Sequence, residues 1–132
     1  MIYFVVPAFN EEANVANLIR RTHAFCAGEE LPYHLIFVDD GSSDRTAEIA
    51  GREFLKSPGT LVSYRPNRGV HEAFRQGFHQ ALSMAQDGDV IVTMEADLTG
   101  DLGLLKKFLA KPASPPRLVA ILNRSLYTGS SR

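Results

Sequence analysis

Two pairs of acidic residues are the side chains best suited to chemistry in this sequence. One apolar run leads into Asp39 and Asp40, and a second apolar run leads into Glu95 and Asp97. Clustered carboxylates repel one another and raise each other's pKa, so they need a cation or hydrogen-bond donors nearby. A divalent metal that carries a phosphorylated ligand would supply what such a cluster needs.

The segment Glu95-Ala96-Asp97 is an acid-x-acid pattern at the end of an expected strand. Residues two apart in an extended segment point to the same side, so both carboxylates are expected to face one ligand. The same letters also fit the start of a helix that Asp97 or Thr99 would cap. This motif alone leaves the metal site and the helix cap both open.

The other polar segments have two interpretations as well. Asp39 ends a buried strand, and a partly desolvated carboxylate there needs a donor, of which a nucleobase ring N–H is one example. The stretch from Asp39 to Asp44 is also typical of a turn followed by a helix cap. Asn10 fits a helix N-cap and Glu11 a first helical turn, besides a ligand contact.

Strands and helices must alternate to position these side chains. Short apolar runs predict strands, and apolar residues at helical spacing predict helices. Strands that are apolar on both faces are typical of an α/β fold with a mainly parallel sheet and helices on both faces. The expected strands are residues 2–6, 35–38, 60–64, 90–94 and 118–122, and the expected helices are residues 11–27, 43–56, 70–85 and 102–109.

Composition limits the class of protein. The 132 residues suit one domain, which we place at residues 1–122, with an irregular tail at residues 123–132. A hydrophobic content of 45% is too high for a disordered chain. The net charge of −1 predicts no attraction to nucleic acid. The single cysteine, Cys26, is expected to be packed in the core and fits a reducing compartment such as the cytoplasm.

Polar residues follow four of the expected strands. Open parallel sheets bind ligands outside the carboxyl ends of their strands, so these residues are expected to meet at one rim. His71 and Arg75 begin a helix at the same rim. The four pairs that converge there are Asn10 and Glu11, Asp39 and Asp40, Asn67 and Arg68, and Glu95 and Asp97.

Four ordered motifs resemble those of a known family. The chain resembles the family 2 glycosyltransferases of the Rossmann-like GT-A fold, in the branch with dolichyl- and polyprenyl-phosphate sugar synthases. The resemblance covers roughly residues 1–110. The matching segments are residues 5–12, 37–46, 67–69 and 88–98.

The resemblance implies roles for these residues. In such enzymes the acid-x-acid motif holds a divalent metal on the diphosphate of a nucleotide-sugar, so Glu95 and Asp97 become the expected ligands of Mg²⁺ or Mn²⁺. Many relatives have Asp where this chain has Glu95. The expected nucleotide contacts are Pro7, Asn10, Glu11, Asp39, Asp40, Asn67 and Glu95.

The expected function is donor binding in a metal-dependent glycosyltransferase. The resemblance implies hexosyl transfer from a nucleotide-diphosphate sugar to a lipid-phosphate or glycan acceptor of the cell envelope. The full-length parent would work in the cytoplasm, at the cytoplasmic face of the membrane.

The segments that carry the acceptor site and the catalytic base in the family have no counterpart in these 132 residues. No catalytic residue is therefore assigned, and the chain by itself is expected to be a truncated, inactive part. The alternative is a non-catalytic module that binds nucleotide-sugars or oligomerises. For the truncated chain, an exposed strand at residues 118–122 predicts a homodimer that buries Leu118, Val119 and Ile121.

Overall fold

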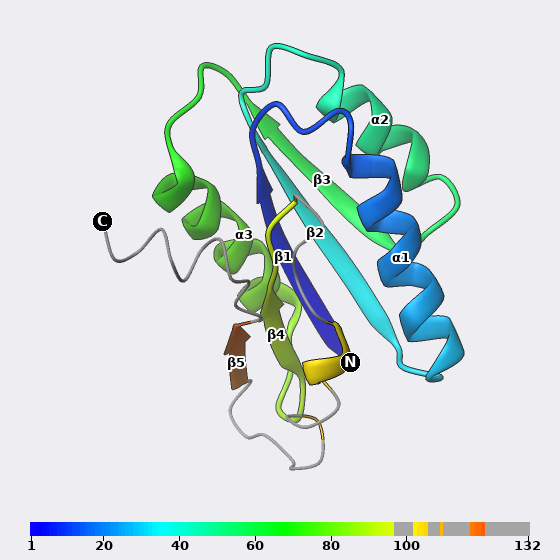
Figure 1. The fold of residues 1–132 in the computed structure, drawn as a ribbon. Helices are drawn as coiled ribbons and strands as arrows, with labels where there is room; N and C mark the ends of the chain where they lie inside the picture. Colours follow the sequence, from blue (N-terminus) through cyan, green and yellow to red (C-terminus); the bar gives the residue numbers. More distant parts are fainter. Residues whose placement is uncertain (97–101, 106–108, 110–116, 121–132) are drawn as a thin grey trace.

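The computed structural model describes residues 1–96, 102–105, 109 and 117–120 (Figure 1). Strands and helices alternate along this part of the chain, as the sequence predicts. The strands are β1 (Ile2–Ala8), β2 (Tyr33–Asp40), β3 (Gly59–Tyr64), β4 (Val90–Thr93) and β5 (Arg117–Ala120). The helices are α1 (Val15–Gly28), α2 (Thr46–Glu53) and α3 (Val70–Met84), with a short 3₁₀ helix, η1 (Leu102–Leu104).

All the described strands pair in parallel, in the order β3-β2-β1-β4-β5. The chain therefore builds outward from β1 to β3, crosses back through α3, and continues on the other side of β1 with β4. This reversal of direction makes the carboxyl ends of β1 and β4 a topological switch point, where open α/β sheets bind ligands. The α/β fold with a parallel sheet is confirmed.

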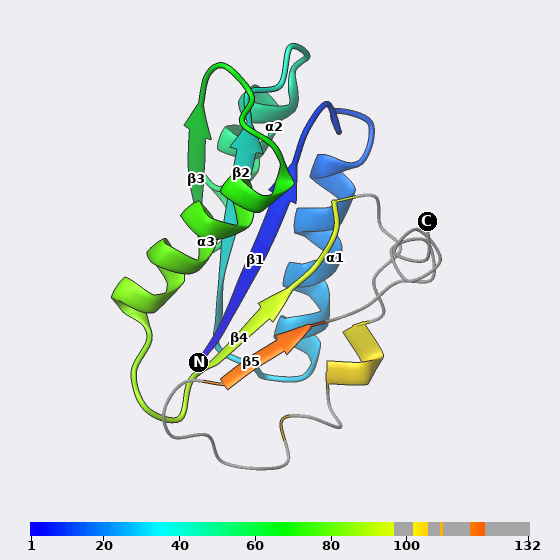
Figure 2. The same ribbon diagram turned by 90° about the vertical axis from the view of Figure 1, so that its left-hand side faces the viewer.

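Helices cover both faces of the sheet (Figure 2). Because side chains alternate along a strand, Phe4 and Val6 of β1 pack in the cluster beneath α1 and α2, whereas Tyr3 and Val5 pack beneath α3. Gly77 lets α3 approach closely, since a Cβ there would lie 2.4 Å from Cγ1 of Val5. The sequence expectation of helices on both faces is thus correct.

Two helices begin later than predicted. Helix α1 begins at Val15 instead of residue 11, and α2 begins at Thr46 instead of residue 43. The predicted N-cap at Asn10 is wrong, because Asn14 holds the N-cap position and Asn10 has a left-handed backbone with φ of 54°. The residues before each helix make long-range hydrogen bonds instead, and these bonds shape the site described below.

Near the carboxyl-terminal end, η1 occupies the start of the helix expected at residues 102–109, and β5 the start of the strand expected at residues 118–122. The end of the strand expected at residues 118–122 and the expected tail at residues 123–132 lie outside the described residues. Among the described helices, none has the length and apolarity needed to cross a membrane. Cys26 is buried in the core as predicted, and burial raises the pKa of its thiol to about 11.

Candidate functional site

Two adjoining cavities lie between the carboxyl end of β1 and the beginning of α3. The first has a volume of about 260 Å³ and the second of about 420 Å³. Both are lined by Pro7, Ala8, Phe9 and Val70. The first cavity is also lined by Asp40, Asn67, Gly69 and Ala73, and the second by Glu11, His71, Phe74, Glu95 and Ala96.

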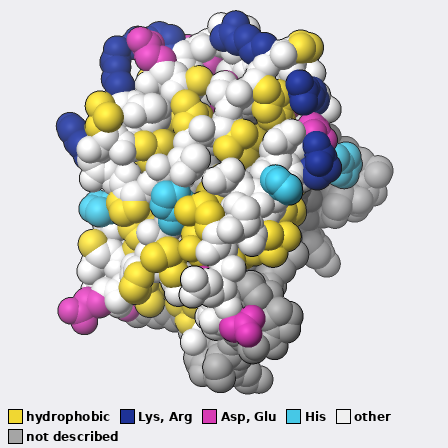
Figure 3. Space-filling model, turned by 180° about the vertical axis from the view of Figure 1, so that it is seen from behind, with side chains coloured by type: hydrophobic (Ala, Val, Ile, Leu, Met, Phe, Trp, Pro, Cys, Tyr) yellow, Lys and Arg dark blue, Asp and Glu magenta, His cyan; other side chains and the backbone are white. Residues whose placement is uncertain are grey.

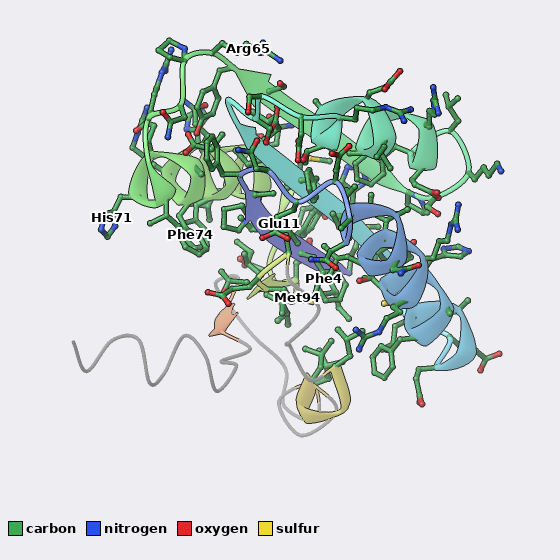
Figure 4. The ribbon with its side chains drawn as sticks, turned by 45° about the horizontal axis from the view of Figure 1, so that its top comes forward. Phe4, Glu11, Arg65, His71, Phe74 and Met94 are labelled. Atoms are coloured by element: carbon green, nitrogen blue, oxygen red, sulfur yellow. The ribbon has the colours of Figure 1, made fainter. Side chains whose placement is uncertain are left out.

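The cavities therefore lie at the switch point of the sheet. Residues from β1, β2, the β3–α3 loop, α3 and the segment after β4 meet there, although they are far apart in the sequence. Figure 4 shows Glu11 between α1 and α3, with Phe74 and His71 on the α3 side of this region. The prediction that Glu11, Asn67 and Glu95 converge at one rim is confirmed.

Asp39 is buried beneath this rim, with a side chain only 1% exposed. Its Oδ1 accepts a hydrogen bond from the backbone N–H of Ser42 at 3.1 Å, and its Oδ2 accepts one from the hydroxyl of Ser63 at 2.9 Å. Ser63 lies directly beside Asp39 in the register of β2 and β3. The carboxylate thus ties the start of the β2–α2 loop to the edge strand.

Asp40 lines the first cavity and holds the β3–α3 loop. Its Oδ1 accepts the backbone N–H of Arg68 at 2.9 Å, and its Oδ2 accepts that of Gly69 at 3.0 Å. Hydrogen bonds from two backbone donors stabilise a buried carboxylate in its charged form. In this structure the carboxylate of Asp40 is therefore stabilised by backbone N–H groups rather than by a basic side chain.

Gly41 lets the same loop lie against β2. Its φ is +71°, and a Cβ at this position would lie 2.5 Å from the backbone nitrogen of Asn67. An L-residue would be strained there and would also displace the loop. Asp40 and Gly41 together fix the position of Asn67 at the cavity wall.

The loop also places an arginine over an aromatic ring. The guanidinium carbon of Arg68 lies 4.9 Å from the centre of the Tyr64 ring, a cation–π contact. Burial, and next the Asp40 carboxylate, raise the pKa of the Tyr64 hydroxyl. Tyr64 is therefore neutral at physiological pH.

A second network fixes the segment after β1. The backbone N–H of Asn10 donates to the Ser42 hydroxyl at 2.9 Å, and the Asn10 side-chain oxygen accepts the backbone N–H of Ser43 at 2.9 Å. The backbone N–H of Glu11 donates to the Thr46 hydroxyl at 2.9 Å. In the described structure Asn10 is thus a bridge between two loops rather than a cavity wall, whereas Glu11 lines the second cavity.

Asp44 completes this network from the start of α2. Its carboxylate accepts hydrogen bonds from the Thr46 backbone and hydroxyl and from the backbone N–H of Glu12. Partial burial raises the pKa of Asp44, but these hydrogen bonds outweigh it, and the pKa is lowered overall. Asp44 therefore stays charged and holds the loops on either side of the rim together.

The chemistry of the second cavity fits a hard divalent cation. Glu11 and Glu95, from the segments that follow β1 and β4, both line this cavity. Mg²⁺ is usually held by one or two protein carboxylates together with substrate phosphates and water, so such a site needs no larger ligand set. The other expected ligand, Asp97, lies outside the described residues, and the described residues contain no group of three metal-type ligands.

Several residues that line the cavities were not predicted to have a role, and four of them have large side chains. Phe9 and Val70 are 47% and 55% exposed, and Phe74 completes an apolar wall between β1 and α3. An exposed phenylalanine directly before Asn10 was a visible signal, because aromatic faces stack on nucleobases. His71 belongs to the same wall, and the sequence analysis placed it only at the rim.

The surface view shows how charge is distributed around this end of the molecule. In Figure 3, lysine and arginine side chains gather toward the end that holds the carboxyl ends of the strands, and hydrophobic side chains occupy the middle of the face. Arg65 and Arg68, in the β3–α3 loop, are both exposed. The rim thus combines buried carboxylates with exposed cations.

The fold and this rim define a parallel α/β domain with cavities at the switch point of its sheet, and comparison with known proteins gives the family. The model of glycosyl transferase family 2 matches residues 3–132. The chain therefore belongs to glycosyl transferase family 2, as its motifs predict.

Several curated relatives are named undecaprenyl-phosphate 4-deoxy-4-formamido-L-arabinose transferase. The protein of this name from Pseudomonas fluorescens is 36% identical over 121 residues, which make up 90% of this chain and 31% of the relative. That from Pectobacterium carotovorum is 41% identical over 96 residues, or 71% of this chain and 28% of the relative. That from Yersinia enterocolitica is 34% identical over 122 residues, or 91% of this chain and 33% of the relative. The chain thus spans about a third of the length of these relatives.

Proposed function

We propose that this chain is the donor-binding part of a metal-dependent glycosyltransferase that moves a sugar from a nucleotide-diphosphate carrier to a lipid phosphate. The observation that carries the proposal is the pair of adjoining cavities at the switch point. The aromatic ring of Phe9 lines both cavities, and the acidic residues Glu11 and Glu95 line the second. Family membership supports sugar transfer, and the names of the relatives support a polyprenyl-phosphate acceptor.

The first cavity suits the nucleoside. Phe9 offers an exposed aromatic face, on which a base would stack. Asp40 lines the same space and supplies an acceptor for a ring N–H, while Asn67 and Pro7 complete its walls. In this proposal Asn10 and Asp39 support the site indirectly, because Asn10 ties the segment after β1 to the β2–α2 loop and Asp39 ties that loop to β3.

The second cavity suits the diphosphate. Glu95 and Asp97 would hold Mg²⁺ or Mn²⁺ on the diphosphate oxygens, with Glu11 nearby. The metal would stabilise the charge that gathers on the leaving nucleoside diphosphate as the glycosidic bond breaks. Glu95 reaches one methylene further than an aspartate, which lets it reach the cation from the end of β4.

Isothermal titration calorimetry tests this proposal. UDP and GDP are titrated into the chain with Mn²⁺ and then with EDTA, and at least one of them is expected to bind with Mn²⁺ and much more weakly without it. Asp97→Asn should reproduce the EDTA result without lowering the melting temperature. Asp87→Asn is the matched control, since Asp87 is an exposed acid before β4 that lines neither cavity.

Equal affinity with Mn²⁺ and with EDTA would remove the metal from the proposal. A large loss of melting temperature in Asp97→Asn would favour the helix-cap interpretation of that residue. In a separate assay with polyprenyl phosphate, we expect no sugar transfer by residues 1–132, because they correspond to only a third of the relatives. The full-length parent is proposed to act at the cytoplasmic face of the membrane.

A further inference from the structure

The arginines around the cavities are already engaged. Arg65 donates a hydrogen bond to the backbone oxygen of Ser42 at 3.1 Å, and Arg68 lies over the ring of Tyr64. Arg75, one turn into α3, pairs with Glu72 at 2.6 Å. Each of these cations is therefore held by a group of the protein itself.

His71 differs from these arginines. It lies in the first turn of α3, is exposed, and lines the second cavity. Among the residues that the structure describes, its imidazole has no hydrogen-bond or ion-pair partner. A side chain with a free ring N–H at a cavity wall is available for a ligand.

The charges of the second cavity give this histidine a specific use. Glu11 and Glu95 are the acidic side chains that line it, and His71 is the one basic side chain among the described lining residues of either cavity. An anionic ligand would be repelled by the two carboxylates unless cations offset them. Figure 4 shows that His71 extends from α3 at the outer side of this region, with Phe74 between it and Glu11.

We propose that His71 donates a hydrogen bond to a phosphate oxygen of the bound nucleoside diphosphate. This inference rests on the proposed function. The metal at the Glu95 side and the imidazole at the α3 side would then hold the diphosphate from opposite directions. A hydrogen bond to a charged phosphate is among the stronger ones in proteins, and its orientation would fix how the diphosphate lies across the cavity.

The test compares a nucleoside with its diphosphate. Calorimetry with Mn²⁺ measures the affinities of UDP and uridine, and of GDP and guanosine, for the unaltered chain, for His71→Ala and for His79→Ala. His79 is the matched control, because it is an exposed histidine two turns further along the same helix and lines neither cavity. His71→Asn, which keeps a side-chain N–H donor, is the conservative variant.

We expect His71→Ala to weaken the diphosphate about tenfold. Its affinity for the nucleoside should not change, His79→Ala should bind both ligands as the unaltered chain does, and His71→Asn should recover part of the loss. An equal loss for nucleoside and diphosphate would overturn the inference, since it would mean that the wall had merely shifted. Unchanged diphosphate affinity in His71→Ala would overturn it too, while leaving the proposed function intact. If neither diphosphate binds the unaltered chain, the proposed function itself fails.

Discussion

The substitutions Asp39→Asn and Asp40→Asn should differ strongly in their effect on stability. Asp39 and Asp40 are next to each other at the end of β2, and both are almost fully buried. Each accepts two hydrogen bonds, one at each carboxylate oxygen. The substitution changes neither side chain's size appreciably, so only the identity of the hydrogen-bond partners separates the two cases.

Asp40→Asn cannot keep both of its hydrogen bonds. Its partners are the backbone N–H groups of Arg68 and Gly69, which can only donate. An amide has one acceptor oxygen, so one N–H would face the NH₂ group of the asparagine. Losing a hydrogen bond to a charged group costs about 1.5–3 kcal/mol, and stranding a buried donor costs about 1–3 kcal/mol. Because water reaches the exposed Arg68, we expect a combined loss of about 2–4 kcal/mol in the free energy of unfolding.

Asp39→Asn can keep both. Its Oδ1 would still accept the N–H of Ser42, and its new NH₂ group would donate to the hydroxyl of Ser63, which turns from donor to acceptor. The expected loss is below about 1 kcal/mol. Urea unfolding of both variants, followed by circular dichroism with the slope m compared throughout, measures the difference. Equal losses, or a larger loss for Asp39→Asn, would refute the account of how these carboxylates are held.

Two further predictions concern packing and burial. Gly77→Ala should lower the free energy of unfolding by about 1–2 kcal/mol despite the better helix propensity of alanine, because its Cβ would lie 2.4 Å from Val5 and the core cannot yield easily. Thermal melts measure this loss, and Gly28→Ala is the control, because no atom lies within 4 Å of the added Cβ and the change should be neutral or stabilising. A Gly77→Ala variant as stable as the unaltered chain would contradict the close packing of α3. Burial raises the pKa of the Cys26 thiol to about 11 in the folded chain, so this thiol stabilises the fold below its unfolded pKa of about 8.5 and loses that contribution as the pH rises through 11. Urea unfolding between pH 8 and 11 should therefore show a steeper decline for the unaltered chain than for Cys26→Ala, and identical slopes would speak against a buried neutral thiol.

The sequence predicted the fold because apolar runs and helical spacing are local signals. Runs such as residues 35–38 and 90–94 are typical of buried strands in a parallel sheet, and the structure has β2 and β4 there. Their carboxyl ends had to share one edge, which placed Glu11, Asp40 and Glu95 around the same cavities. Family membership followed from the same ordered motifs.

The beginnings of the helices could not be predicted in this way. A helix N-cap was one of two interpretations of Asn10, because asparagine often has that role, but its side chain accepts the N–H of Ser43, which is 33 residues away. Likewise Glu11 donates its N–H to the hydroxyl of Thr46, 35 residues away, and α1 begins only at Val15. Periodicity records which residues face the core, and it contains no information about hydrogen bonds between distant loops. For the same reason the sequence could not show that Asp39 accepts hydrogen bonds from Ser42 and Ser63.

The order of the strands has a consequence for how the molecule is made. Every residue that lines the first cavity lies between Pro7 and Ala73, whereas the second cavity also needs Glu95, which follows the crossover to β4. The ribosome synthesises a chain from its amino terminus. The walls proposed for the nucleoside are therefore synthesised before the carboxylates proposed for the metal.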